Sequence, residues 1–95
     1  MLQNPIEAKY INPKKKNPDE ILNLIKSSIR KNKSENMTID ISTLNMFDAS
    51  KIISIASTYH FLKFAHGSIN WIVKSKEVEK LLKPLSLGNS KFISA

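Results

Sequence analysis

The residues that could carry out chemistry are few, and two acids stand out in the middle of the chain. Asp40 lies in the apolar run "MTIDIS", and Asp48 begins the helix-like segment "DASKII". A hydrolase with paired carboxylates needs both acids across a cleft of substrate size, and a chain of 95 residues has little room for one. We therefore predict that Asp40 is a hydrogen-bond acceptor at a strand end and that Asp48 is a helix N-cap.

Other chemistry is limited by composition. The chain contains no cysteine, which excludes disulfides and Cys-ligated zinc or iron–sulfur sites. His60 and His66 lack the i, i+4 spacing of a metal pair on one helix face, so we expect ordinary helix-end residues. With two glycines and no phosphate-binding loop, dinucleotide motif or Ser-His-Asp arrangement, we predict no catalytic residue, no metal and no cofactor. The chain is not expected to be an enzyme.

Strand and helix patterns alternate along the chain. Alternating apolar residues predict strands at 5–11, 37–42, 68–74 and 91–95. Apolar residues every three or four positions predict helices at about 18–31, 48–65 and 76–83. The order β-α-β-α-β-α-β implies right-handed crossovers. We predict an α/β domain with a mostly parallel four-stranded sheet and helices packed against it.

Several residues mark where the predicted helices begin and end. Asn17, Pro18 and Glu20 form a capping box with proline at the first helical position. Gly67 is expected to end the second helix, and Ser75 to cap the third, which Pro84 closes. The expected inward face of the second helix consists of Ile52, Ile53, Ala56, Tyr59 and Leu62.

The chain reads as one small domain with a basic net charge. Residues 1–16 are interpreted as an N-terminal edge strand and basic linker, and 17–95 as the domain core. The net charge is +7, which suits nucleic acid, anionic lipid or an acidic protein. The lysines are mostly scattered, however, and accompany many Ile, Asn and Ser residues, which favours a compositional bias over a binding face. No signal peptide or bilayer-spanning run is found, and a cytoplasmic location is expected.

The segment from about Met37 to about Leu85 resembles a STAS domain, the module of anti-sigma factor antagonists and sulphate transporter tails. The strand end "IDIS", the linker "TLNM" and the helix start "FDAS" follow the family order, as does "GSINWIVKSKEVEKLL" after them. Ala49 stands where the family has its first serine, and Lys51 where it has a glycine. The positive charge also differs from the acidic antagonists.

The resemblance implies a non-enzymatic regulatory module that binds an anti-sigma factor or serine-kinase-type protein. By position, Ser50 is then the serine that the partner kinase phosphorylates, and a phosphate in the first turn of a helix is favourably placed. Alternatively, Ser50 is only a polar contact near a helix start. The implied partner-binding residues are Asp48, Ala49, Ser50, Lys51 and Ser54.

Two further function classes stay open. A STAS subunit of a membrane-associated ATPase or lipid-transport complex would tolerate loss of the Ser50 hydroxyl. A small basic nucleic-acid-binding domain would bind DNA or RNA in a strongly salt-dependent way.

Overall fold

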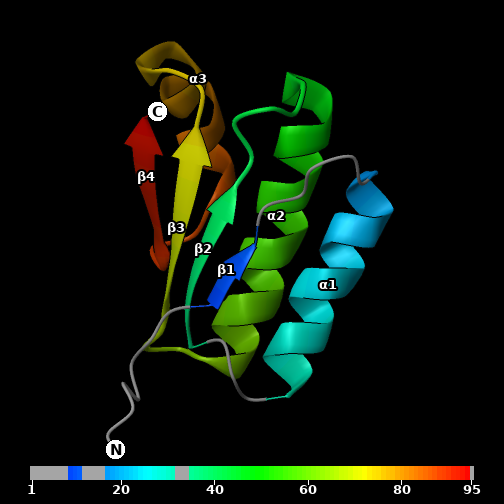
Figure 1. Ribbon diagram of the computed structural model, residues 1–95. Coiled ribbons are helices and arrows are strands. Elements are labelled where there is room, and N and C mark those ends of the chain that lie inside the picture. The colour runs from blue at the N-terminus through cyan, green and yellow to red at the C-terminus, as the bar shows by residue number, and fades with distance from the viewer. Residues whose placement is uncertain (1–8, 12–16, 32–34, 95) are drawn as a thin grey trace, which may run out of the picture.

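The computed structural model describes residues 9–11, 17–31 and 35–94 and has α/β architecture, as predicted (Figure 1). Its elements are β1 (Lys9–Ile11), α1 (Pro18–Arg30), β2 (Asn36–Asp40), α2 (Met46–Lys63), β3 (Ser68–Val73), α3 (Lys76–Leu82), the 3-10 turn η1 (Lys83–Leu85) and β4 (Ser90–Ser94). The predicted strand at 5–11 lies only partly in the described residues. The predicted boundary at residue 16 lies outside them.

The strands follow one another across the sheet in the order β1-β2-β3-β4, and each neighbouring pair is parallel. The body of the sheet is made of the three parallel strands β2, β3 and β4, which have five or six residues each. Beside β2, the segment β1 adds only three residues at the edge. The predicted parallel pairing of the strands from "MTIDIS" and "SINWIVK" is confirmed, with Ile39 opposite Trp71.

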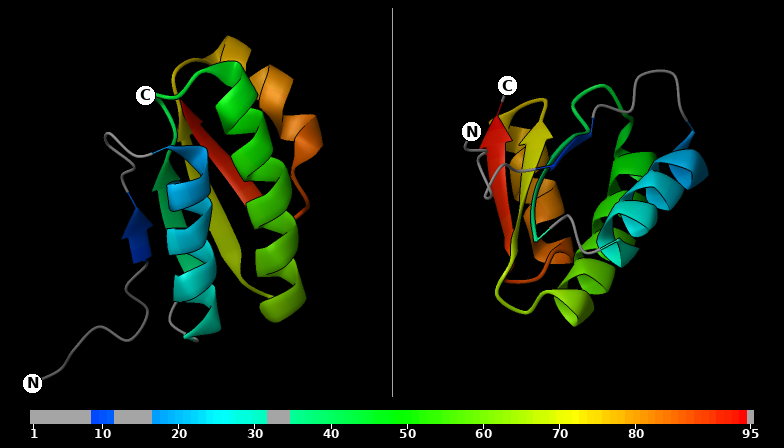
Figure 2. Two further views of the ribbon diagram at one scale, coloured as in Figure 1. Left: turned by 90° about the vertical axis from the view of Figure 1, so that its right-hand side faces the viewer. Right: turned by 60° about the horizontal axis from the view of Figure 1, so that its bottom comes forward.

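The helices lie together on one face of the sheet (Figure 2). This follows from sequential parallel strands joined by crossovers of the same hand, because each helix returns on the same side. Every second residue of β2 and β3 is buried beneath the helices. Ile72 and polar side chains alternate with them on the other face, where Ser68 Oγ donates to Asn36 Oδ1 over 3.0 Å. No described helix covers that face.

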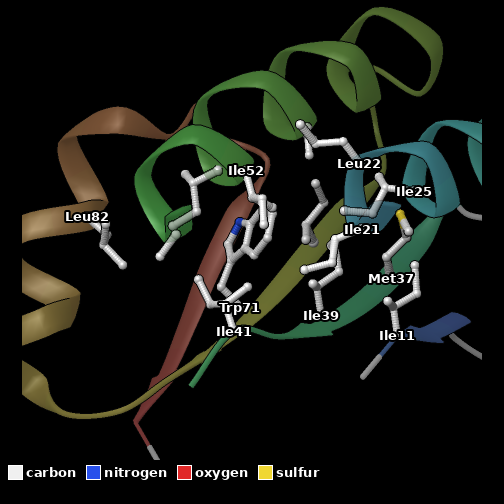
Figure 3. Packing of buried hydrophobic residues seen from close by; sticks show 14 of the residues in the cluster. Ile11, Ile21, Leu22, Ile25, Met37, Ile39, Ile41, Ile52, Trp71 and Leu82 are labelled. Atoms are coloured by element: carbon white, nitrogen blue, oxygen red, sulfur yellow. The ribbon is translucent and has the colours of Figure 1, made fainter. Parts of the chain in front are cut away.

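The core is rich in isoleucine and is shared by all three helices (Figure 3). Trp71 points from β3 toward α2, where Ile52 lies, and both side chains are fully buried. Leu82 adds the contribution of α3. The remaining fully buried large apolar residues are Ile21, Ile25, Ile29, Met37, Ile39, Ile53, Ile69 and Val73.

The first and third helices begin as predicted. Glu20 N donates to Asn17 Oδ1 over 2.9 Å, and Asn17 N donates to Glu20 Oε1 over 3.0 Å, which completes the capping box. Ser75 Oγ accepts from Val78 N at the start of α3. Pro84 lies in the 3-10 turn that follows this helix. These local signals were sufficient because each cap lies within three residues of its partner.

The inward face of α2 is confirmed except at its end. Ile52, Ile53 and Ala56 are buried and Tyr59 packs partly against the core. Leu62, in contrast, is 78% exposed, so its predicted inward position is wrong. Each residue advances about 100° around a helix, which places Leu62 on the opposite side from the buried His60.

The end of α2 contains a polar contact that the histidine spacing did not predict. His66 is exposed, but His60 in the last helical turn is fully buried, with its Nδ1 3.4 Å from Asn89 Nδ2. The same Asn89 amide donates to Ser57 O over 3.1 Å. The prediction that Gly67 ends the helix is also wrong, because α2 ends at Lys63. Gly67 instead follows a turn in which its N–H donates to Phe64 O.

Candidate functional site

The candidate site lies where the chain leaves β2 and enters α2. Ile41 N still donates to Ile72 O over 3.0 Å, which holds the start of the connection against β3. The Asp40 carboxylate accepts from Ser42 N over 3.0 Å and from Ser42 Oγ over 2.6 Å. Asp40 is therefore the strand-end hydrogen-bond acceptor that the sequence predicted. Its contacts fix the turn that leads into the helix.

The N-cap of α2 is Asn45, and the prediction that Asp48 is the cap is wrong. Asn45 Oδ1 accepts from Asp48 N over 2.8 Å, and Asn45 Nδ2 donates to Asp48 Oδ2 over 3.3 Å. The two side chains therefore hold one another across the first turn. Asn and Asp are about equally good caps, so the short turn after β2 decides which one is used. The Asp48 carboxylate remains favourably placed near the positive end of the helix dipole.

Ser50 consequently lies deeper in the helix than predicted. Because α2 begins at Met46, Ser50 is the fifth helical residue and belongs to the second turn. Its hydroxyl donates to Met46 O over 2.7 Å, within the helix, and the residue is partly exposed. The amide groups of the first turn, which were expected to hold a phosphate, lie one turn away.

The other predicted partner-binding residues differ in how accessible they are. Lys51 is exposed and its Nζ lies 3.2 Å from Asp19 Oδ1 of α1, a surface ion pair. Ser54 is partly exposed. Ala49 is only 2% exposed and packs in the core, so it cannot be contacted by a partner as the prediction implied. It faces inward because it precedes Ile52 and Ile53 by three and four residues on the same helix face.

Phe47, which directly precedes the helix predicted at about 48–65, is the most exposed large apolar residue of the described residues. Phe47 is 81% exposed in the first turn of α2. Nothing in the sequence distinguishes it from a core residue, because it stands beside another apolar residue, Met46. Its exposure depends on where the helix begins. With the helix starting at Met46, Phe47 points away from Ala49 and the sheet.

Four residues at the beginning of α2 form a continuous stripe. Phe47, Ser50, Lys51 and Ser54 are spaced i, i+3, i+4 and i+7, which places them on one side of the helix. Asp48 borders this stripe, three residues before Lys51. We call these five residues the α2 entry patch. It combines one large apolar side chain with two hydroxyls and two opposite charges, which is suitable for docking a protein.

The described residues contain neither three grouped His, Asp or Glu side chains that could hold a metal ion nor a helix long and apolar enough to span a membrane. Comparison of the chain with models of protein families, with curated proteins and with solved structures finds no match. The resemblance to STAS domains therefore rests on the order and spacing of the sequence motifs.

Proposed function

We propose that the protein is a non-enzymatic regulatory module that binds a protein partner through the α2 entry patch. Following the resemblance to anti-sigma factor antagonists, the partner is an anti-sigma factor or serine-kinase-type protein, and Ser50 is the residue it phosphorylates. One observation carries the proposal. Phe47 is 81% exposed and lies on the same helical stripe as Ser50.

An exposed phenylalanine beside polar residues is suited to anchor an interface. Aromatic side chains at the centre of interfaces commonly contribute about 2 kcal/mol or more when they enter a pocket on the partner. Lys51 can also contact the partner. Its surface ion pair with Asp19 is worth only about 0–1 kcal/mol, so little stability is lost if the pair is broken. The polar groups around Phe47 would form the rim of the interface.

A phosphate on Ser50 would act against docking for two reasons. It replaces the hydroxyl proton, which removes the hydrogen bond to Met46 O. It also adds a charge of about −1.5 to −2 between Phe47 and Ser54, on a patch that already contains Asp48. Since Ser50 lies in the second turn, the backbone N–H groups of the first turn are not adjacent to it and do not donate hydrogen bonds to this phosphate. The phosphate is then presented to the partner, which must desolvate it.

The proposal is tested by affinity capture from the source cell with matched variants. The full chain should capture an anti-sigma or serine-kinase-type protein, identified by mass spectrometry. Phe47→Ala and Ser50→Asp should lose it, whereas Leu81→Ala, which shortens another exposed apolar residue, on α3, should retain it. After incubation with ATP and the captured partner, phosphate should be found on Ser50.

Two outcomes would contradict the proposal in different parts. If the same proteins are captured by all variants, the α2 entry patch is not the docking site. If Phe47→Ala abolishes capture but Ser50→Asp does not, docking is correct and the switch is wrong. The latter pattern is the one expected for a STAS subunit that works without phosphorylation.

A further inference from the structure

A second exposed surface lies between the outer sides of α1 and α2, towards their C-terminal ends. Two adjoining hollows there have volumes of about 400 and 380 Å³, and Tyr59 and Leu62 border both of them. One hollow is also lined by Ile29, Arg30 and Lys63, and the other by Lys26, Ser54, Ile55 and Thr58. We call this surface the α1–α2 groove.

The floor of the groove is apolar. Ile55, Tyr59 and Leu62 are spaced i, i+4 and i+7, so they form a stripe along α2. Ile55 is 37% exposed and Leu62 is 78% exposed. From Ile55 to Leu62 the stripe is about 10 Å long, which corresponds to two turns of a helix laid along it. Burying such an apolar stripe against a partner is favourable, because it removes apolar surface from water.

The borders of the groove are basic. Lys26 and Arg30 come from α1 and Lys63 from α2, and none of the described residues that line the hollows is acidic. Lys26 Nζ lies 5.6 Å from the centroid of the Tyr59 ring, which is within the range of a cation–π contact. The cations therefore flank the apolar stripe from both helices. This distribution differs from the α2 entry patch, where Lys51 already lies beside Asp19.

We propose that the α1–α2 groove binds an acidic amphipathic helix of another protein. Its apolar residues, three and four apart, would pack on Ile55 and Leu62, and its flanking Asp or Glu side chains would meet Arg30 and Lys63. An α-helix fits a groove between two helices, because its side-chain ridges pack into the grooves of neighbouring helices. Charge complementarity selects an acidic helix over a basic one.

This surface adjoins the α2 entry patch, because Ser54 belongs to both. Either proposal can still fail alone, because the residues changed in the two tests lie far apart on α2. Leu62 follows Ser50 by twelve residues, which corresponds to roughly 18 Å along the helix. A substitution at Leu62 therefore leaves Phe47 and Ser50 in place. A substitution at Phe47 leaves the floor of the groove in place.

The test uses a displayed library of helical peptides. Each member has leucine at i, i+4 and i+7, with the flanking positions randomised between glutamate and lysine. Panning on the full chain should enrich glutamate at the flanks. The most enriched peptide, fluorescently labelled, is then titrated with the protein and followed by anisotropy. Leu62→Asp and Arg30→Glu should each weaken its binding at least tenfold.

Matched controls separate this result from non-specific association. Leu81→Asp places the same change on an exposed leucine of α3, and it should alter binding less than twofold, as should Phe47→Ala. Circular dichroism should show unchanged helix content for every variant. Absence of glutamate enrichment, or peptide binding that ignores Leu62→Asp, would overturn the proposal. Binding of phosphatidylglycerol vesicles or a labelled oligonucleotide that Arg30→Glu abolishes, without an enriched peptide, would also overturn it.

Discussion

Replacing Gly67 by alanine should be among the most damaging single-methyl changes in the domain. A Cβ at this position would lie 2.2 Å from Glu35 O, 2.8 Å from His60 Cε1 and 3.1 Å from Phe64 Cβ. The first contact is with backbone, and His60 is fully buried, so neither neighbour can move aside easily. Glu35 O also accepts the hydrogen bond from Ser68 N that begins the pairing of β2 and β3.

The size of the effect follows from these contacts. Overpacking a well-packed site costs about 1–3 kcal/mol. Weakening the hydrogen bond from Ser68 N to Glu35 O adds roughly 1 kcal/mol. We therefore expect Gly67→Ala to lower the free energy of unfolding by about 3 kcal/mol, a large part of the 5–15 kcal/mol typical of a domain. For a domain of this size the midpoint of thermal unfolding should fall by roughly 12–24 °C.

Urea denaturation followed by tryptophan fluorescence measures this change directly, because Trp71 is the single tryptophan and is fully buried. Gly88→Ala is the matched control. A Cβ at Gly88 would meet nothing within 4 Å, so this substitution should change stability by less than about 0.5 kcal/mol. If both alanine variants are equally stable, the close packing of β2, β3 and the end of α2 around Gly67 is refuted.

Three further predictions concern the helices. Asn45→Ala should lower the free energy of unfolding by about 1 kcal/mol and Asp48→Asn by less, because Asn45 is the cap of α2. Urea denaturation measures both changes, and the reverse order would contradict the cap assignment. In the same assay, Leu82→Ala should lower the free energy of unfolding by about 2–5 kcal/mol, because Leu82 is fully buried. Leu81→Ala should lower it by less than about 0.5 kcal/mol, because Leu81 is 63% exposed. If both substitutions lower it equally, α3 packs on the core through a different face. Ser50→Ala should change the unfolding free energy by less than about 1 kcal/mol, since its hydroxyl bonds only to Met46 O within the helix, and a larger loss would make the serine structural.

The sequence predicted the α/β architecture because its signals are local. Alternating apolar residues in "MTIDIS" and the capping box at Asn17 each involve residues within one turn or one strand. The buried contact of His60 could not be predicted in this way. Its partner Asn89 lies 29 residues away in the chain, and only the pairing of β3 with β4 brings it there.

The sequence indicated where the candidate site lies, but it did not predict the cap residue of α2 or the exposure of Phe47. The segment around Ser50 was singled out correctly as a helix start, while the helix begins three residues earlier than the cap assignment at Asp48 required. Two equally good capping residues three positions apart cannot be ranked without the turn that precedes them. The same shift leaves Phe47 exposed, which an apolar pattern alone could not reveal.

Site-specific photocrosslinking at Phe47 tests the proposed docking site most directly. A photoreactive phenylalanine analogue replaces Phe47 in one variant and Leu81 in the control, and both are irradiated in the source cell. We predict that position 47 crosslinks to an anti-sigma or serine-kinase-type protein, that position 81 does not, and that adding Ser50→Asp removes the crosslink. Crosslinks from both positions to the same proteins, or no crosslinked partner at position 47, would show that the α2 entry patch is not the docking site.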